Sequence, residues 1–256
     1  MAHISARIFA ASLGHSTSIE VIIPNNPLAP KPVEKVLYLL HGLGQDCTAW
    51  GRYTNIEALA EKYNYAVIMP EVHRSFYANM VYGSDYFDYV AFELPKICEQ
   101  LFQINHVREK TFAAGLSMGG YGALRCGLTR PEFYGACAGF SGSVEPQARV
   151  EALEQFGMGK QIVGILGQSL AYPDEANLYK LASKVAFLPE IEKPKVLITC
   201  GDKDYLLEDN RRLDAHMKKL SIPYKYMEWA GEHDFKFWQE SLSVMFEYFE
   251  EIEGVY

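Results

Sequence analysis

The sequence lacks long apolar runs and an excess of positive charge, and each absence excludes a class of protein. Its longest apolar stretches, such as residues 36–40 and 65–69, have the length of a strand and are too short to span a bilayer. The 24 lysines and arginines are outnumbered by 32 acidic residues, giving a net charge of −8. Binding to nucleic-acid phosphates needs clustered cations, so we expect neither a nucleic-acid-binding protein nor a membrane protein.

The cysteines show no pairing pattern. There are five of them, an odd number, scattered without a CxxC motif: Cys47, Cys98, Cys126, Cys137 and Cys200. This pattern disfavours a disulfide framework and a structural zinc site. Residues 1–13 have no basic segment and no apolar core of useful length, so we predict a first strand there and not a signal peptide. These features are typical of a cytoplasmic protein.

The 256 residues suffice for one domain with a large core, and strand patterns alternate with helix patterns along them. A hairpin of residues 4–10 and 18–23, closed around Gly14-His15, opens the chain. Strands are then predicted at 35–40, 65–70, 111–116, 135–140, 195–200 and 224–229, and helices at 54–62, 86–102, 118–128, 210–220 and 235–252. The alternation predicts an α/β fold, a mostly parallel sheet with helices on both faces.

Two of the predicted helices carry local signals. Thr54 and Glu57 have the spacing of a capping box, which predicts that Thr54 begins the helix 54–62. Pro95 lies inside the helix 86–102 and is expected to kink it or mark a boundary, because proline removes a helical N–H.

Residues 143–189 interrupt the alternation. They show no strand pattern, and only short helices are predicted, at 150–156 and 177–186. Because the segment lies between two predicted strands, we expect a single domain, 1–256, with 143–189 inserted as a small helical cap over the carboxyl edge of the sheet.

A nucleophile motif lies between a predicted strand and a predicted helix. Residues 115–119 (GLSMG) match G-x-S-x-G, which places Ser117 on a tight strand-to-helix turn. Glycines two residues to either side remove side chains that would collide with that turn. The N–H of Met118, at the helix start, and the N–H of Leu43, in the glycine-rich sequence His41-Gly42-Leu43-Gly44, are predicted to stabilise an oxyanion.

A serine hydroxyl needs a base and an acid that orients the base. In folds with this motif the chain order is serine, acid, histidine. Of the seven histidines, five precede Ser117, and His216 falls within the helix 210–220, where we expect it on the surface. His233, in a loop after the last strand, is therefore the predicted base. Asp204 is the predicted acid, with Asp202 as the rival in the same loop.

With these positions in place, the sequence resembles the esterase D-like branch of the α/β-hydrolases, and in particular the small bacterial tributyrin esterases. The matching text is YLLHG at 38–42 with Trp50 downstream, YG at 82–83, DY at 85–86, ELP at 93–95, AGLSMGGYG at 114–122, and CG at 200–201 leading through Asp204 to Asn210. The resemblance implies an α/β-hydrolase fold and a carboxylesterase of short acyl groups. It also implies the triad Ser117, Asp204 and His233, no cofactor, and often a homo-oligomer.

The same branch contains S-formylglutathione hydrolases, which usually read Ser-Gly-Leu-Thr-Cys at the oxyanion loop. This chain has His41-Gly42-Leu43-Gly44-Gln45 there, and its nearest thiol, Cys47, is displaced by two residues. Acetyl-sugar and feruloyl esterases are further alternatives, and an alternative of another class is a non-catalytic hydrolase-fold protein that binds a ligand. The aromatic-rich stretch 76–89 is expected either to line an acyl or aromatic pocket or to fill the core.

Overall fold

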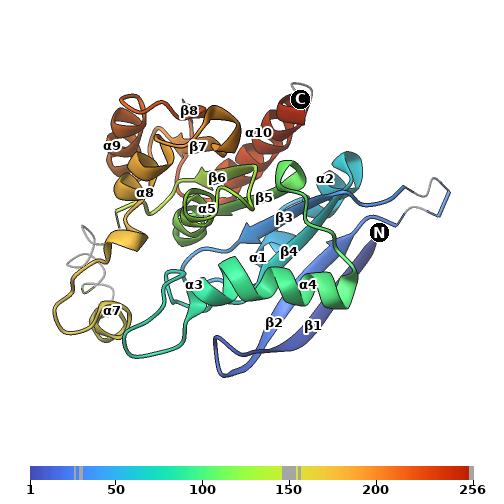
Figure 1. Ribbon diagram of the computed structural model, residues 1–256, viewed down its shortest axis with the longest axis horizontal. Coiled ribbons are helices and arrows are strands. Elements are labelled where there is room, and N and C mark those ends of the chain that lie inside the picture. The colour runs from blue at the N-terminus through green and yellow to red at the C-terminus, as the bar shows by residue number, and fades with distance from the viewer. Residues whose placement is uncertain (26, 29–30, 146–153, 155–156, 254–256) are drawn as a thin grey trace.

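An eight-stranded sheet forms the centre of the molecule in the computed structural model, which describes residues 1–25, 27–28, 31–145, 154 and 157–253 (Figure 1). Its strand order is β1-β2-β4-β3-β5-β6-β7-β8. Their bounds are β1 Ala2–Ala10, β2 His15–Ile23, β3 Lys35–Leu40, β4 Tyr65–Pro70, β5 Thr111–Leu116, β6 Ala136–Phe140, β7 Lys195–Gly201 and β8 Tyr224–Trp229. Strands β1 and β2 form the predicted antiparallel hairpin, β2 pairs antiparallel with β4, and every later pairing is parallel. The predicted fold class is confirmed.

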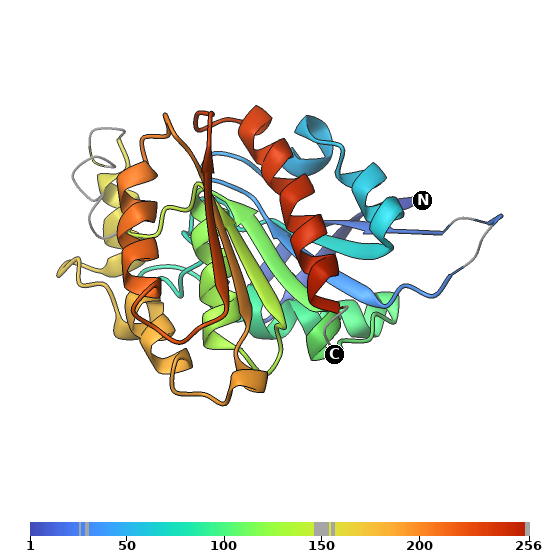
Figure 2. The same cartoon turned by 90° about the horizontal axis from the view of Figure 1, so that it is seen from above.

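The two faces of the sheet are covered by different helices, and β3 shows how the sequence arranges this. Its alternate residues Val36, Tyr38 and Leu40 belong to one core cluster, whereas Leu37 and Leu39 belong to the other. A continuous apolar run is what a strand buried on both faces requires. Helices α1, α2 and α10 pack on one face, and α4, α5, α8 and α9 pack on the other (Figure 2).

The described helices lie close to the predicted ones. Their bounds are α1 Ala49–Tyr53, α2 Ile56–Tyr63, α3 Tyr86–Asp88, α4 Leu94–Phe102, α5 Met118–Thr129, α7 Gly159–Leu166, α8 Leu178–Val185, α9 Leu207–Met217 and α10 Phe235–Glu253. No helix within the described ranges is long and apolar enough to cross a membrane.

The predicted capping box at Thr54 is wrong. Thr54 is the C-cap of α1, where both its N–H and its hydroxyl bond to the carbonyl of Trp50. Helix α2 begins two residues later, at Ile56, and its N-cap residue Asn55 accepts no side-chain capping bond. The hydrophobic periodicity does not indicate the short helix α1, and Thr54 ends this helix instead of beginning the next one.

Pro95 marks a boundary, as expected. The π-helical turn η1, Tyr89–Glu93, joins α3 to α4, and Pro95 stands in the first turn of α4. Because proline has no N–H, the carbonyl of Ala91, four residues earlier, loses its ordinary helical donor. The Nη1 of Arg130 donates a hydrogen bond to that carbonyl. The Arg130 guanidinium thus supplies a donor to a carbonyl that cannot bond to residue 95.

The segment between β6 and β7 shows no strand among its described residues and contains α7 and α8 (Figure 1). Helix α8 matches the predicted helix 177–186 and is capped by Asn177, which accepts the N–H groups of Tyr179 and Lys180. The helix predicted at 150–156 lies outside the described residues apart from Glu154. His216 is not a surface residue, because it is half-buried and its Nε2 lies 3.0 Å from the Tyr179 carbonyl oxygen.

Candidate active site

Ser117 occupies a strained turn at the carboxyl end of β5. Its backbone has φ 53° and ψ −116°, a combination that costs a side-chain-bearing residue on the order of 1–3 kcal/mol. Neighbouring backbone holds it in place. The Ser117 N–H donates to the Phe140 carbonyl at 2.9 Å, and the Ser117 carbonyl accepts the Ser143 N–H at 3.0 Å. The turn is therefore fixed by β6 and the segment that follows it.

The glycines on either side of the turn are required by close backbone approach. A Cβ on Gly115 would lie 2.4 Å from the carbonyl oxygen of Gly119, and one on Gly119 would lie 2.3 Å from that of Leu40. Both distances are far inside van der Waals contact. The predicted reason for the motif, that side chains two residues from the serine would collide, is confirmed.

The structure brings Ser117, His233 and Asp204 together. The Nε2 of His233 is 3.0 Å from the Ser117 Oγ, and its Nδ1 is 2.8 and 3.1 Å from the two carboxylate oxygens of Asp204. A carboxylate beside Nδ1 favours the tautomer with the proton there, which leaves Nε2 free to accept the serine proton. This arrangement can activate a hydroxyl as a nucleophile.

Asp204, and not its rival Asp202, contacts the imidazole. The Asp204 side chain is fully buried and also accepts the Leu206 N–H at 2.8 Å. Burial alone would raise its pKa, but the hydrogen bond and charge of His233, with the Leu206 N–H, bring the pKa below its usual value. Asp202 is exposed and accepts the Gly231 N–H at 3.1 Å, so it holds the histidine-bearing loop to the acid-bearing loop.

Two aromatic rings flank the imidazole of His233. The ring centroids of Tyr205 and Trp238 lie 4.5 and 4.9 Å from it. Trp238 carries no separate sequence signal, because an aromatic residue in an amphipathic helix cannot be told from a core residue by its pattern.

The two predicted oxyanion donors lie beside the serine. Residues 42–45 form a tight turn in which the Gln45 N–H bonds to the Gly42 carbonyl at 3.2 Å, and Gly44 has φ 78°, as the third position of a type II turn demands. Leu43 and Met118 both line the cavity that contains Ser117. Because the N–H groups of the first helical turn lack helical partners, that of Met118, at the start of α5, is available to an anion.

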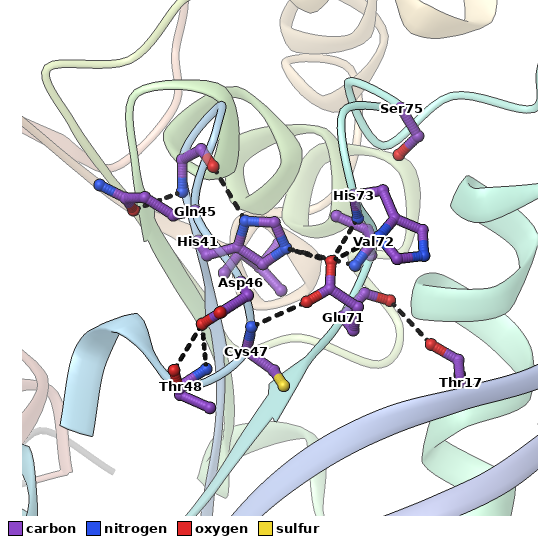
Figure 3. A network of polar contacts seen from close by, with 12 residues as sticks. Thr17, His41, Gln45, Asp46, Cys47, Thr48, Glu71, Val72, His73 and Ser75 are labelled. Atoms are coloured by element: carbon purple, nitrogen blue, oxygen red, sulfur yellow. Dashed lines mark hydrogen bonds and ion pairs between the residues drawn. The ribbon is translucent and has the colours of Figure 1, made fainter. Parts of the chain in front are cut away.

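A second histidine–carboxylate pair lies behind the oxyanion loop, and sequence reasoning missed it (Figure 3). The buried His41 has Nδ1 2.9 Å from the Gly42 carbonyl oxygen, and Nε2 3.2 Å from the Val72 nitrogen and 3.5 Å from Glu71 Oε1. Glu71 also accepts the N–H groups of Cys47 at 3.1 Å and His73 at 2.6 Å. Burial tends to raise the pKa of Glu71, but the hydrogen bond and charge of His41 and the backbone donors lower it to about 2. The available signal was a carboxylate directly after a wholly buried strand.

The cavity over Ser117 has a volume of about 620 Å³. Its walls are mostly apolar and come from both sides of the nucleophile: Gly42, Leu43, Gly44, Gln45, Arg74, Phe76, Leu116, Met118, Ser143, Met158, Tyr205, Leu206, His233 and Trp238. Phe76 is thus the member of the aromatic-rich stretch 76–89 that reaches the cavity, whereas Tyr77, Phe87 and Tyr89 are core residues. This volume suits a small organic substrate.

A parallel sheet that carries a strained serine at a strand end, within reach of a histidine and its carboxylate, defines a serine hydrolase of the α/β-hydrolase fold. Comparison with known proteins narrows the class. The family model described as "Putative esterase" matches residues 10–249. An acetyl esterase of Caldicellulosiruptor saccharolyticus is 30% identical over 98% of this chain and 99% of its own length.

Two solved structures from Staphylococcus aureus are similar over nearly the whole fold. Fluorophosphonate-binding serine hydrolase F, in its substrate-bound form, has a TM-score of 0.86. The S-formylglutathione hydrolase FrmB, as apoenzyme, has a TM-score of 0.84. Each is 33% identical to this chain, with 97% of this chain and 98% of the other covered. The chain belongs to this esterase family, on the esterase D-like branch, and it is a serine ester hydrolase rather than a non-catalytic relative.

Proposed function

We propose that Ser117, His233 and Asp204 are the catalytic triad of this esterase. The observation that carries the proposal is the unbroken series of contacts from the Asp204 carboxylate through both imidazole nitrogens to the Ser117 Oγ. Ser117 attacks the ester carbonyl carbon while His233 takes the hydroxyl proton. His233 then protonates the leaving alcohol, and an acyl-enzyme remains. Water, deprotonated by the same imidazole, releases the acid and restores the serine.

The negative charge of each tetrahedral intermediate is held by the N–H groups of Leu43 and Met118 in this proposal. Such donors stabilise the transition state more than the ground state, because charge develops on the carbonyl oxygen as the bond to serine forms. The tight turn at residues 42–45 and the start of α5 support the assignment.

The proposed substrates are small esters with short acyl groups, such as acetate or butyrate. The cavity of about 620 Å³ and the acetyl esterase among the relatives support this range, and the sequence resemblance to tributyrin esterases agrees with it. A second candidate is the thioester S-formylglutathione, favoured by the similarity to the staphylococcal S-formylglutathione hydrolase. Acetyl-sugar and feruloyl esters complete the panel to be tested.

The segment 143–189 is proposed to act as a cap that limits the size of the acyl group. Met158, from the described part of this segment, lines the cavity together with Ser143. We also propose a cytoplasmic location, supported by five cysteines that are all buried and free. A homo-oligomer is proposed on the family resemblance alone.

Hydrolysis of p-nitrophenyl esters from acetate to decanoate, beside S-formylglutathione, an acetylated sugar and methyl ferulate, tests the proposal. We expect the highest kcat/KM at acetate or butyrate, and a burst of nitrophenol wherever deacylation is the slower step. Ser117→Ala should abolish both hydrolysis and labelling by a fluorophosphonate. Ser16→Ala, on the exposed end of the hairpin, is the matched control. Full activity in Ser117→Ala would refute the triad.

A further inference from the structure

One wall of the cavity is a short loop after β4, residues 71–77, and its backbone is unusual. His73, Phe76 and Tyr77 have φ of 53°, 53° and 50°, in the left-handed region that side-chain-bearing residues seldom adopt. From this loop Arg74 and Phe76 reach the cavity that contains Ser117. Such a backbone persists only where surrounding contacts hold it.

Glu71 supplies those contacts at the start of the loop (Figure 3). Its carboxylate accepts the His73 N–H at 2.6 Å and the Cys47 N–H at 3.1 Å, so it joins this loop to the oxyanion loop. At the far end the Tyr77 hydroxyl donates to the His41 carbonyl at 2.9 Å, and the Tyr77 N–H donates to the Ser75 Oγ at 3.1 Å. Arg74 therefore projects from a loop fixed at both ends, which reduces the entropy lost when a ligand binds it.

Arg74 is electrostatically distinct within the cavity. Among the described residues that line the cavity, Arg74 is the single lysine or arginine, and these residues include no carboxylate. Arg74 is exposed and forms no ion pair among the described residues, whereas Arg211 and Arg212, which are also exposed, are each paired with two carboxylates. In a chain of net charge −8, an unpaired guanidinium in the substrate cavity is a local attraction for anions.

We propose that Arg74 is a specificity-determining residue that binds a carboxylate carried by the ester, so that the preferred substrates are anionic esters. The inference rests on the proposed function of Ser117 and deepens it by naming a substrate class. The planar guanidinium can donate two parallel N–H bonds to a carboxylate, a geometry that a neutral amide cannot match. The carboxylate lies on either the acid or the alcohol part of the ester, and the experiment distinguishes the two.

Two matched pairs of esters test the proposal. The first pair carries the charge on the alcohol side, 4-acetoxybenzoate against 4-acetoxybenzamide. The second carries it on the acid side, monophenyl adipate against its terminal amide. For each pair the ratio of kcat/KM, carboxylate over amide, is measured in the wild type, Arg74→Gln, Arg74→Lys and Arg7→Gln. Arg7 is exposed on β1 and outside the cavity lining, so its variant controls for the loss of one positive charge. Intrinsic ester reactivity cancels when the ratio is compared between proteins.

We expect the ratio for at least one pair to fall about fivefold in Arg74→Gln, the upper part of the range for a charge pair whose cation is exposed. Arg74→Lys should retain part of the preference, Arg7→Gln all of it, and added salt should weaken it in the wild type. A ratio that changes less than about twofold in Arg74→Gln for both pairs overturns the proposal. Failure of the proposed function looks different, because Ser117→Ala would then hydrolyse all four esters at the wild-type rate.

Discussion

Two histidine–carboxylate pairs belong to the loops around Ser117, and they differ in what surrounds the imidazole. In the pair His233–Asp204, one nitrogen faces the carboxylate and the other faces a hydroxyl, and the imidazole side chain is 15% exposed. In the pair His41–Glu71 the imidazole is 1% exposed and lies against the Gly42 carbonyl and the Val72 nitrogen. In the proposed mechanism the pair His233–Asp204 transfers protons, because one imidazole nitrogen faces the serine hydroxyl. The buried pair joins two loops, because its imidazole nitrogens face backbone atoms and the Glu71 carboxylate.

The largest test of this contrast is Asp204→Asn. The amide keeps the size of the side chain but favours the wrong imidazole tautomer, so we expect kcat for p-nitrophenyl acetate to fall by roughly 10³- to 10⁴-fold. Asp202→Asn, two residues away in an exposed position, should leave kcat within about twofold of the wild type, because the asparagine Oδ1 can still accept the Gly231 N–H. Equal losses in the two variants would show that the acid has been misassigned.

The corresponding test of the other pair is Glu71→Ala, whose main effect should be on folding. It removes the carboxylate from three backbone and imidazole partners, so we expect the free energy of unfolding to fall by about 2–4 kcal/mol in urea titrations. Activity should fall as well, because both cavity loops lose an anchor. Glu71→Gln is the milder control, since its amide oxygen still accepts one N–H. A Glu71→Ala protein as stable as the wild type would contradict the architectural role.

Acid provides a separate test of the Glu71 network. The pKa of Glu71 is lowered to about 2, so its ionised form stabilises the fold above the ordinary glutamate pKa, and this contribution is lost as pH falls through about 2. A lowering of this size corresponds to about 3 kcal/mol. The difference in unfolding free energy between wild type and Glu71→Gln should therefore shrink between pH 5 and pH 2. A difference that stays constant over this range would exclude a charged Glu71 as the source.

The smallest expected effect concerns the aromatic contact between Tyr205 and His233. Tyr205→Leu removes a ring that lies 4.5 Å from the imidazole and is itself 65% exposed. We expect kcat/KM to fall about two- to fivefold, with less than about 1 kcal/mol of stability lost. Tyr205→Phe keeps the ring and should behave as wild type does. An unchanged Tyr205→Leu would mean that Asp204 and Trp238 orient the imidazole without the Tyr205 ring.

Most of the sheet and the proposed triad could be predicted because their signals are local. Buried parallel strands appear in the sequence as apolar runs, and the turn at Ser117 requires glycine at both 115 and 119. The choice of Asp204 over Asp202 was also predictable, since reach depends on distance past the strand end. Thr54 was misassigned because one threonine can end a helix as well as begin one, and only tertiary packing decides.

The Glu71 network could not have been derived in the same way. Its partners come from residues 41, 47 and 73, in two loops that are neighbours only because β3 and β4 pair. A glutamate directly after an apolar strand signals a position at the carboxyl edge of the sheet, but its neighbours along the chain do not identify its hydrogen-bond partners. The pairing of β3 with β4 brings these partners to Glu71, and a single sequence does not show which strands pair.

The close approach of Gly119 to Leu40 has an evolutionary consequence. A methyl group on Gly119 would collide with main-chain atoms, which cannot rotate away as a side chain can. We therefore expect glycine to be retained at this position as the sequence evolves. Arg74 lies on a cavity wall whose loop is held by the Glu71 and Tyr77 contacts, and its exposed side chain can be exchanged without removing any of these contacts. New substrate preferences should therefore arise by substitution at position 74, and directed libraries are best concentrated at that codon.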